Sequence, residues 1–171
     1  LGESFGAWSM GDDESLLDIV ASANIACGFH AGDPLVMRRT VAAAKKRGVS
    51  IGAHPAFPDL QGFGRRRMDI PAAELDAMII YQIGALKAMA AAEGSCVSHV
   101  KPHGALSNMA CADPALADCV ARAVHAISPQ LILLAPAYSR LATAGERIGL
   151  PVILEIFADR AYQDDGQLMP R

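Results

Sequence analysis

Three histidines occur where short apolar stretches of the sequence end. They are His30 in CGFHAGDP, His54 in GAHPAFPD and His103 in KPHGAL. Imidazole transfers protons near neutral pH and also binds transition metals through a neutral nitrogen, and the spacing leaves both chemistries open. A single histidine of this kind is more often a buried group bonded to backbone carbonyls. Three of them at three separate strand ends predict a functional cluster.

Other polar residues near these ends have two interpretations each. Lys101 precedes His103 by two residues, and it is either a cation for a carboxylate or developing oxyanion, or an exposed lysine. Asn24 is a polar residue in an apolar run, so it needs hydrogen-bond partners. It is expected to face a ligand or, if the predicted strands form a barrel, the barrel interior. His99 is expected to point away from the cluster, and His125 is interpreted as a structural helix residue.

Residues 55–71 lack apolar periodicity and contain three prolines and three consecutive arginines. Long loops in compact domains are often functional, and guanidinium groups suit carboxylate or phosphate ligands. The three are Arg65, Arg66 and Arg67. We expect one of them to reach a ligand and the other two to be solvated. Asp59 in this loop and the pair Asp164–Asp165 are either acid/base or orienting carboxylates, or turn and cap residues.

Short apolar runs alternate with longer helical patterns. Runs that are apolar throughout are typical of parallel strands covered on both faces. The predicted strands are Ala23–Cys27, Val49–Ala53, Val97–Lys101, Leu131–Leu134 and Val152–Ile156. In parallel α/β folds, the loops at the carboxyl ends of the strands form the ligand site. The pattern therefore predicts an α/β protein with its chemistry at the histidine-bearing ends.

Helix boundaries have recognisable signals. Asp33–Pro34 and Asp113–Pro114 each place a carboxylate at the N-cap and a proline at the first helical position. One apolar stripe at helical spacing predicts a core helix: Leu75, Met78, Ile79, Ile83, Leu86 and Ala90. Three glycines are placed as left-handed residues after helices: Gly48, Gly94 and Gly149.

Composition excludes several functional classes. The 171 residues are 52% hydrophobic and 5% aromatic, with a net charge of −3, which argues against nucleic-acid binding. The long uninterrupted apolar runs fall short of the roughly 20 residues that cross a bilayer, so no membrane span is expected. The four cysteines show no CxxC pair, and we expect reduced thiols in a cytoplasmic protein. No phosphate-loop or dinucleotide fingerprint is present.

Long, ordered segments resemble the LamB/YcsF family, which supplies the A subunit of ATP-dependent 5-oxoprolinases. The matching text is LGESFGAW, GDDESLL, SANIACGFHAGDP, IGAHPAFPDLQGFGRR, YQIGALKA, HVKPHGAL and ADRAYQDDG. The resemblance implies an irregular TIM-like (β/α) barrel of the glycoside hydrolase/deacetylase type. It also implies one domain over residues 1–171 whose first and last strands are missing from this sequence. Ala56 and Ser107 depart from the family pattern.

By this resemblance, the protein opens 5-oxoproline to glutamate with ATP as co-substrate and with B and C subunits as partners. His54, His103 and Lys101 are then the catalytic residues, with either histidine as the acid/base. A loop arginine binds the substrate carboxylate. The residues of the hypothesis that bind substrate are Asn24, His30, Asp59, Arg65 and Arg66. No residue is assigned to a metal, and a metal requirement is left open.

Two alternatives remain. The histidine cluster and the HxxxS spacing from His103 to Ser107 also fit a metal-dependent, deacetylase-like hydrolase, acting on carbohydrate or amide substrates. Its acidic ligands are expected to come from a strand that precedes Leu1. The second alternative is a noncatalytic scaffold subunit whose site only senses a ligand.

Overall fold

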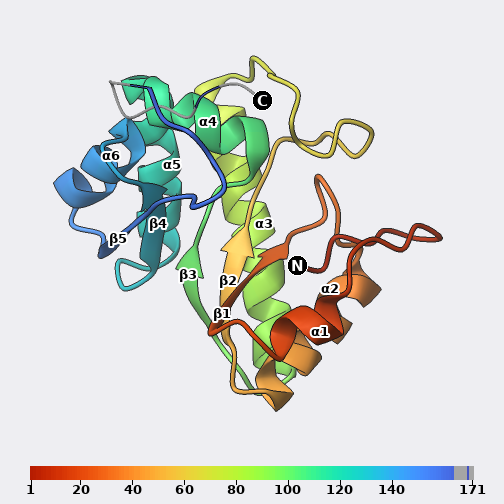
Figure 1. The fold of residues 1–171 in the computed structure, drawn as a ribbon. Helices are drawn as coiled ribbons and strands as arrows, with labels where there is room; N and C mark the ends of the chain where they lie inside the picture. Colours follow the sequence, from red (N-terminus) through yellow and green to blue (C-terminus); the bar gives the residue numbers. More distant parts are fainter. Residues whose placement is uncertain (164–168, 170–171) are drawn as a thin grey trace.

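Five strands form one parallel sheet in the order β1-β2-β3-β4-β5 (Figure 1). The structure, a computed structural model, describes residues 1–163 and 169. The strands are β1 (Ser22–Ala26), β2 (Ser50–His54), β3 (Val97–Val100), β4 (Ile132–Pro136) and β5 (Val152–Glu155). All five predicted strands are confirmed, with boundaries that differ by no more than about two residues, as is normal for such assignments.

The strand order determines where the helices lie. Each crossover moves to the next strand in the same direction, and parallel crossovers are right-handed, so the connecting helices cover one face of the sheet. These elements are α2 (Pro34–Lys46), α3 (Ala72–Ala92), α4 (Gly104–Ala112), α5 (Pro114–Ile127) and α6 (Arg140–Ile148), with α1 (Asp13–Leu17) before β1. This is the winding of a (β/α) barrel, as predicted. In the described residues the sheet does not close on itself.

Local capping explains where the predicted helices begin. The Asp33 carboxylate accepts hydrogen bonds from the amides of Leu35 and Val36 at 2.9 and 3.1 Å, with Pro34 at the first helical position. Asp113 caps α5 in the same way. The three glycines predicted after helices adopt left-handed backbone conformations, which confirms that signal.

Helix α3 carries the predicted apolar stripe. Five of its six stripe residues are buried, and Met78 is half-buried. By length and composition it is apolar enough to cross a membrane, alone among the helices of residues 1–163. Its stripe, however, packs against β2, β3 and α5, so α3 is a core helix.

The opposite face of the sheet carries polar side chains. Asn24, Gly52 and His99 are register partners on β1, β2 and β3. Nε2 of His99 lies 3.1 Å from Oδ1 of Asn24, across β2. A Cβ atom on Gly52 would lie 2.0 Å from the His99 ring, so this glycine makes the contact possible. Two residues farther along β2, on the same face, is His54.

Residues 1–4 run along the free edge of β1. The Leu1 amino group donates to the carbonyl of Asn24, and the amide of Ala26 donates to the carbonyl of Leu1. The amide of Gly32, in the loop after β1, donates to the carbonyl of Ser4. These bonds place Glu3 beside the carboxyl ends of the strands.

Candidate functional site

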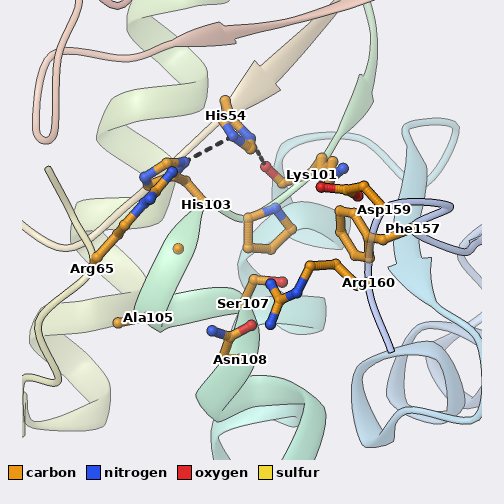
Figure 2. Close-up of a pocket in the computed structure, with 12 residues that line it drawn as sticks. His54, Arg65, Lys101, His103, Ala105, Ser107, Asn108, Phe157, Asp159 and Arg160 are labelled. Atoms are coloured by element: carbon orange, nitrogen blue, oxygen red, sulfur yellow. Dashed lines mark hydrogen bonds between the residues drawn. The ribbon is translucent and has the colours of Figure 1, made fainter. Parts of the chain in front are cut away.

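The structure brings the three histidines together. His54 is the last residue of β2, His103 is the N-cap of α4, and His30 lies in the loop after β1. The rings of His30 and His103 stack with centroids 3.9 Å apart and an interplanar angle of 6°. Nε2 of His54 lies 3.0 Å from Nδ1 of His103 (Figure 2).

Backbone carbonyls fix the tautomers of two of these rings. Nδ1 of His54 lies 2.5 Å from the carbonyl oxygen of Lys101, and Nε2 of His103 lies 2.8 Å from that of Phe63. A carbonyl only accepts hydrogen bonds, so each of these nitrogens carries the proton of its ring. In the neutral rings, the two nitrogens that face each other are therefore unprotonated.

Burial keeps the cluster uncharged. It lowers the pKa of His30 to about 3 and that of His54 well below its usual range, because desolvation penalises the imidazolium form. Burial lowers the pKa of His103 in the same direction, against the opposing effect of its bond to Phe63. The three rings are thus neutral proton acceptors or metal ligands at neutral pH.

His30 has no hydrogen-bond partner in the described part of the chain. It is 1% exposed, and both of its ring nitrogens are unbonded. Its Nε2 lies 4.0 Å from Oε1 of Glu3, a residue that the sequence patterns did not indicate. Glu3 also reaches the other two rings, because one donor atom each from Glu3, His54 and His103 lie within 4.8 Å of one another.

The loop 55–71 is held by Asp59 and Arg66. The Asp59 carboxylate accepts hydrogen bonds from the Gly62 amide at 2.9 Å and from Nε of Arg66 at 2.9 Å, and it forms an ion pair with the same guanidinium. Both residues were hypothesised to bind substrate, but their groups are used within the loop. The loop in turn positions Phe63, whose φ of 54° is unusual for a non-glycine residue and whose carbonyl fixes His103.

Replacing Asp59 by asparagine is expected to lower the free energy of unfolding by about 1.5–3 kcal/mol at pH 7, the range for hydrogen bonds to charged groups. The Arg66 guanidinium lowers the pKa of Asp59, so the stabilisation is present above the usual carboxyl pKa and is lost as pH falls through the folded-state value. Urea titrations should show the difference from wild type shrinking below about pH 4. A matched change of Asp69, an exposed carboxylate of the same loop, should have little effect; equal losses for both would contradict the assignment.

A cavity of about 330 Å³ lies beside the histidines (Figure 2). Its walls include His54, His103, Lys101 and Arg65, together with residues of α4 and of the segment after β5. Of the three loop arginines, Arg65 lines the cavity. Its guanidinium lies over the Phe63 ring, 5.3 Å from the centroid.

Lys101 lines the cavity as part of an ion pair. Its Nζ lies 2.6 Å from Oε2 of Glu155, and 4.8 Å from the centroid of the Phe157 ring. Arg160 completes this side of the cavity. Sequence reasoning missed Glu155, Phe157 and Arg160. Nothing local in the sequence indicates that the end of β5 and the segment after it lie near Lys101, which follows β3.

The remaining predicted residues lie elsewhere. The Asn24 side chain bonds to His99 and does not line the cavity, so its interior position is explained by that pair. His125 lies in the last turn of α5. Asp164 and Asp165 lie outside the described residues.

Gln82 is a positioning residue that sequence reasoning missed. It is fully buried on α3, where its side-chain oxygen accepts from the amide of Ala56 and its nitrogen donates to the carbonyl of Ala56, at 2.9 and 3.0 Å. This pair of bonds holds the chain just after His54–Pro55. A single polar residue within the apolar stripe of α3 was the available signal.

Comparison with known proteins gives one consistent family. A sequence model described as the LamB/YcsF family matches residues 1–171. The 5-oxoprolinase A subunit of Azoarcus sp. (strain BH72) is 67% identical over the whole chain, which covers 67% of that relative. The 5-oxoprolinase A subunit of Bacillus subtilis (strain 168) is 59% identical, with 66% of the relative covered.

A solved structure agrees with the sequence comparisons. The lactam utilization protein from Thermus thermophilus superposes with a TM-score of 0.96 at 48% identity. The match covers 100% of this chain and 69% of that protein. The chain therefore spans about two thirds of the length of the relatives it matches.

Proposed function

Because this chain belongs to the LamB/YcsF family, we propose that it acts in the A subunit of an ATP-dependent 5-oxoprolinase, which opens 5-oxoproline to L-glutamate. The observation that carries the proposal is the arrangement of His54, His103, Lys101 and Arg65 around one cavity at the strand ends. Relatives named as 5-oxoprolinase subunits support it. The other subunits of such an enzyme are the proposed partners.

The cavity suits a small anionic lactam. Its volume lies at the lower end of the range for small-molecule sites, about 300–1,000 Å³. Arg65 is the group that binds the substrate carboxylate, because Arg66 is already paired with Asp59. Lys101 remains close to the substrate, but its pair with Glu155 offsets its charge. It therefore contributes a positioned hydrogen-bond donor more than a net positive field.

In the proposed reaction, ATP activates the lactam carbon by phosphorylating its oxygen, and the ring then opens to an acyl phosphate. The lactam oxygen attacks the γ-phosphorus of ATP, and ADP leaves. Water then adds to the activated carbon, giving up a proton to an unprotonated nitrogen of His54 or His103. The ring C–N bond breaks, the nitrogen leaves as an amine with a proton, and an acyl phosphate remains. A second water hydrolyses the acyl phosphate to glutamate and phosphate.

Reconstitution with the partner subunits tests the proposal. We expect glutamate formation from 5-oxoproline to require ATP and all subunits. Turnover without ATP or partners would favour the deacetylase-like hydrolase and overturn the proposal. If calorimetry shows that 5-oxoproline binds, but turnover does not depend on the site residues, the chain would instead be a ligand-sensing scaffold.

Arg65→Met is expected to raise KM for 5-oxoproline about 10- to 100-fold, with a smaller change in kcat, because a hydrogen-bonded charge pair contributes about 1.5–3 kcal/mol. The measurement is steady-state kinetics of the reconstituted enzyme. Arg67→Met, an exposed arginine two residues away, is the matched control and should leave KM unchanged. A larger effect at Arg67 than at Arg65 would contradict the carboxylate assignment.

The proposed compartment is the cytoplasm. All four cysteines are free thiols, including the exposed Cys96, which fits a reducing environment. The proposal includes neither a nucleic acid nor a membrane partner.

A further inference from the structure

The contact between His54 and His103 joins two acceptor atoms. Each ring uses its one proton on a backbone carbonyl, which lies on the far side of the ring from the other histidine. Nε2 of His54 and Nδ1 of His103 are then both unprotonated and only 3.0 Å apart. Two lone pairs at this distance repel each other unless a cation lies between them.

The separation of the two nitrogens suits two ligands of one metal ion. Zinc binds histidine nitrogen at about 2.0–2.1 Å, so adjacent ligands of one ion are about 2.9–3.4 Å apart. The observed 3.0 Å lies in that range. Both rings are held by their carbonyl bonds, which is how metal-binding histidines are usually oriented.

Glu3 supplies a third donor. One of its carboxylate oxygens and one ring nitrogen of each of His54 and His103 lie within 4.8 Å of one another. The Glu3 side chain is flexible and 29% exposed, so a small rotation can bring its carboxylate to the two facing nitrogens. An acidic side chain thus lies beside the histidines within the chain, in addition to the acidic ligands that the sequence-based expectation placed before Leu1. The buried His30 lies beside this carboxylate with two unbonded nitrogens and can donate to it.

We propose that Nε2 of His54, Nδ1 of His103 and the Glu3 carboxylate bind one divalent transition-metal ion. Two histidines and one glutamate with an open position form a donor set used by catalytic metal sites, and both histidines line the cavity. A metal-bound water loses its proton near neutral pH, so the ion would activate the water that the histidines otherwise deprotonate directly. Only this last role rests on the proposed function; binding of the ion does not.

Metal binding by the intact protein tests the site. After removal of metals with a chelator, titration calorimetry and elemental analysis with Zn²⁺, Mn²⁺ and Co²⁺ should show one equivalent of at least one ion. His54→Gln and His103→Gln should each weaken binding about 100-fold or more, and Glu3→Gln about 10- to 100-fold. Changes of residues that only orient metal ligands already lower metal affinity about 10- to 100-fold, so loss of a ligand should cost at least as much. His125→Gln, on α5, is the matched control and should bind like wild type.

Several outcomes overturn the site. These are the absence of stoichiometric binding for all three ions, unchanged affinity in Glu3→Gln, or loss of binding in Cys96→Ser, which would identify an ion held by the exposed thiol. Glu3→Gln keeps the test sharp if a histidine variant misfolds, because Glu3 is not in the core. ATP-dependent turnover by metal-free protein would overturn the catalytic role of the ion alone, whereas metal binding without any such turnover would overturn the proposed function alone.

Discussion

Turnover of 5-oxoproline by the reconstituted enzyme should fall about 10³-fold or more when His54 and His103 are both replaced by alanine. The double variant removes both unprotonated nitrogens of the two histidines that line the cavity, and general acid/base catalysis alone contributes about 10²–10⁴-fold. Steady-state kinetics with saturating ATP and partner subunits measures the loss. Normal turnover by this variant would contradict the proposed function.

The two single variants sharpen the prediction. The rings are in direct contact, and each is fixed by its own carbonyl, so they act as one unit. Each single change should therefore cost nearly as much as both together, a strongly non-additive result. Circular dichroism must show that the variants are folded. His125→Ala, outside the cluster, is the control and should retain normal kcat.

Gly32→Ala is expected to lower the free energy of unfolding by about 3 kcal/mol or more. Gly32 has a φ of 78°, and an added Cβ would lie 2.7 Å from the carbonyl oxygen of Ala26 and 2.9 Å from that of Gly2. These neighbours are backbone atoms and cannot rotate away. Left-handed strain contributes about 1–2 kcal/mol and overpacking about 1–3 kcal/mol.

Gly149→Ala is a matched control for Gly32→Ala. Gly149 also has a left-handed backbone, with a φ of 85°, but nothing lies within 4 Å of an added Cβ. This change should therefore cost only the left-handed strain, about 1–2 kcal/mol. Urea denaturation of both variants measures the difference. Equal losses would show that the close approach of the Ala26 and Gly2 carbonyls to Gly32 contributes nothing.

Local signals explain why so much of the fold was predictable. The strands are short, mostly apolar runs of four or five residues, and α2 and α5 begin at Asp-Pro pairs whose carboxylates cap them in the structure. Each signal acts between residues within one or two turns of each other. The parallel winding then follows, because consecutive crossovers have one hand.

Clustering of the site residues was predictable for a related reason. Carboxyl ends of parallel strands meet at one edge of a sheet, so His30, His54 and His103 had to lie near one another. Their number and position therefore pointed to the site. Their protonation did not follow from the sequence, because it depends on the carbonyls of Phe63 and Lys101, which other segments supply.

The partners of the charged residues were not predictable. Asp59 and Arg66 were assigned to substrate, but the loop uses them to hold its own shape. Lys101 is paired with Glu155, which is 54 positions later in the chain. Sequence spacing carries no information on such long-range pairs, since any exposed cation could equally be solvated.

By itself, the sequence determined the parallel α/β elements, the edge of the sheet where chemistry gathers, and the family resemblance. Only the tertiary structure decided which side chains face the cavity, which charges are already paired, and that Glu3 lies beside the histidines. The physical reason is the range of the interactions. Caps and apolar periodicity act over a few residues, whereas the direction of a lone pair or a carboxylate depends on contacts between segments far apart in the chain.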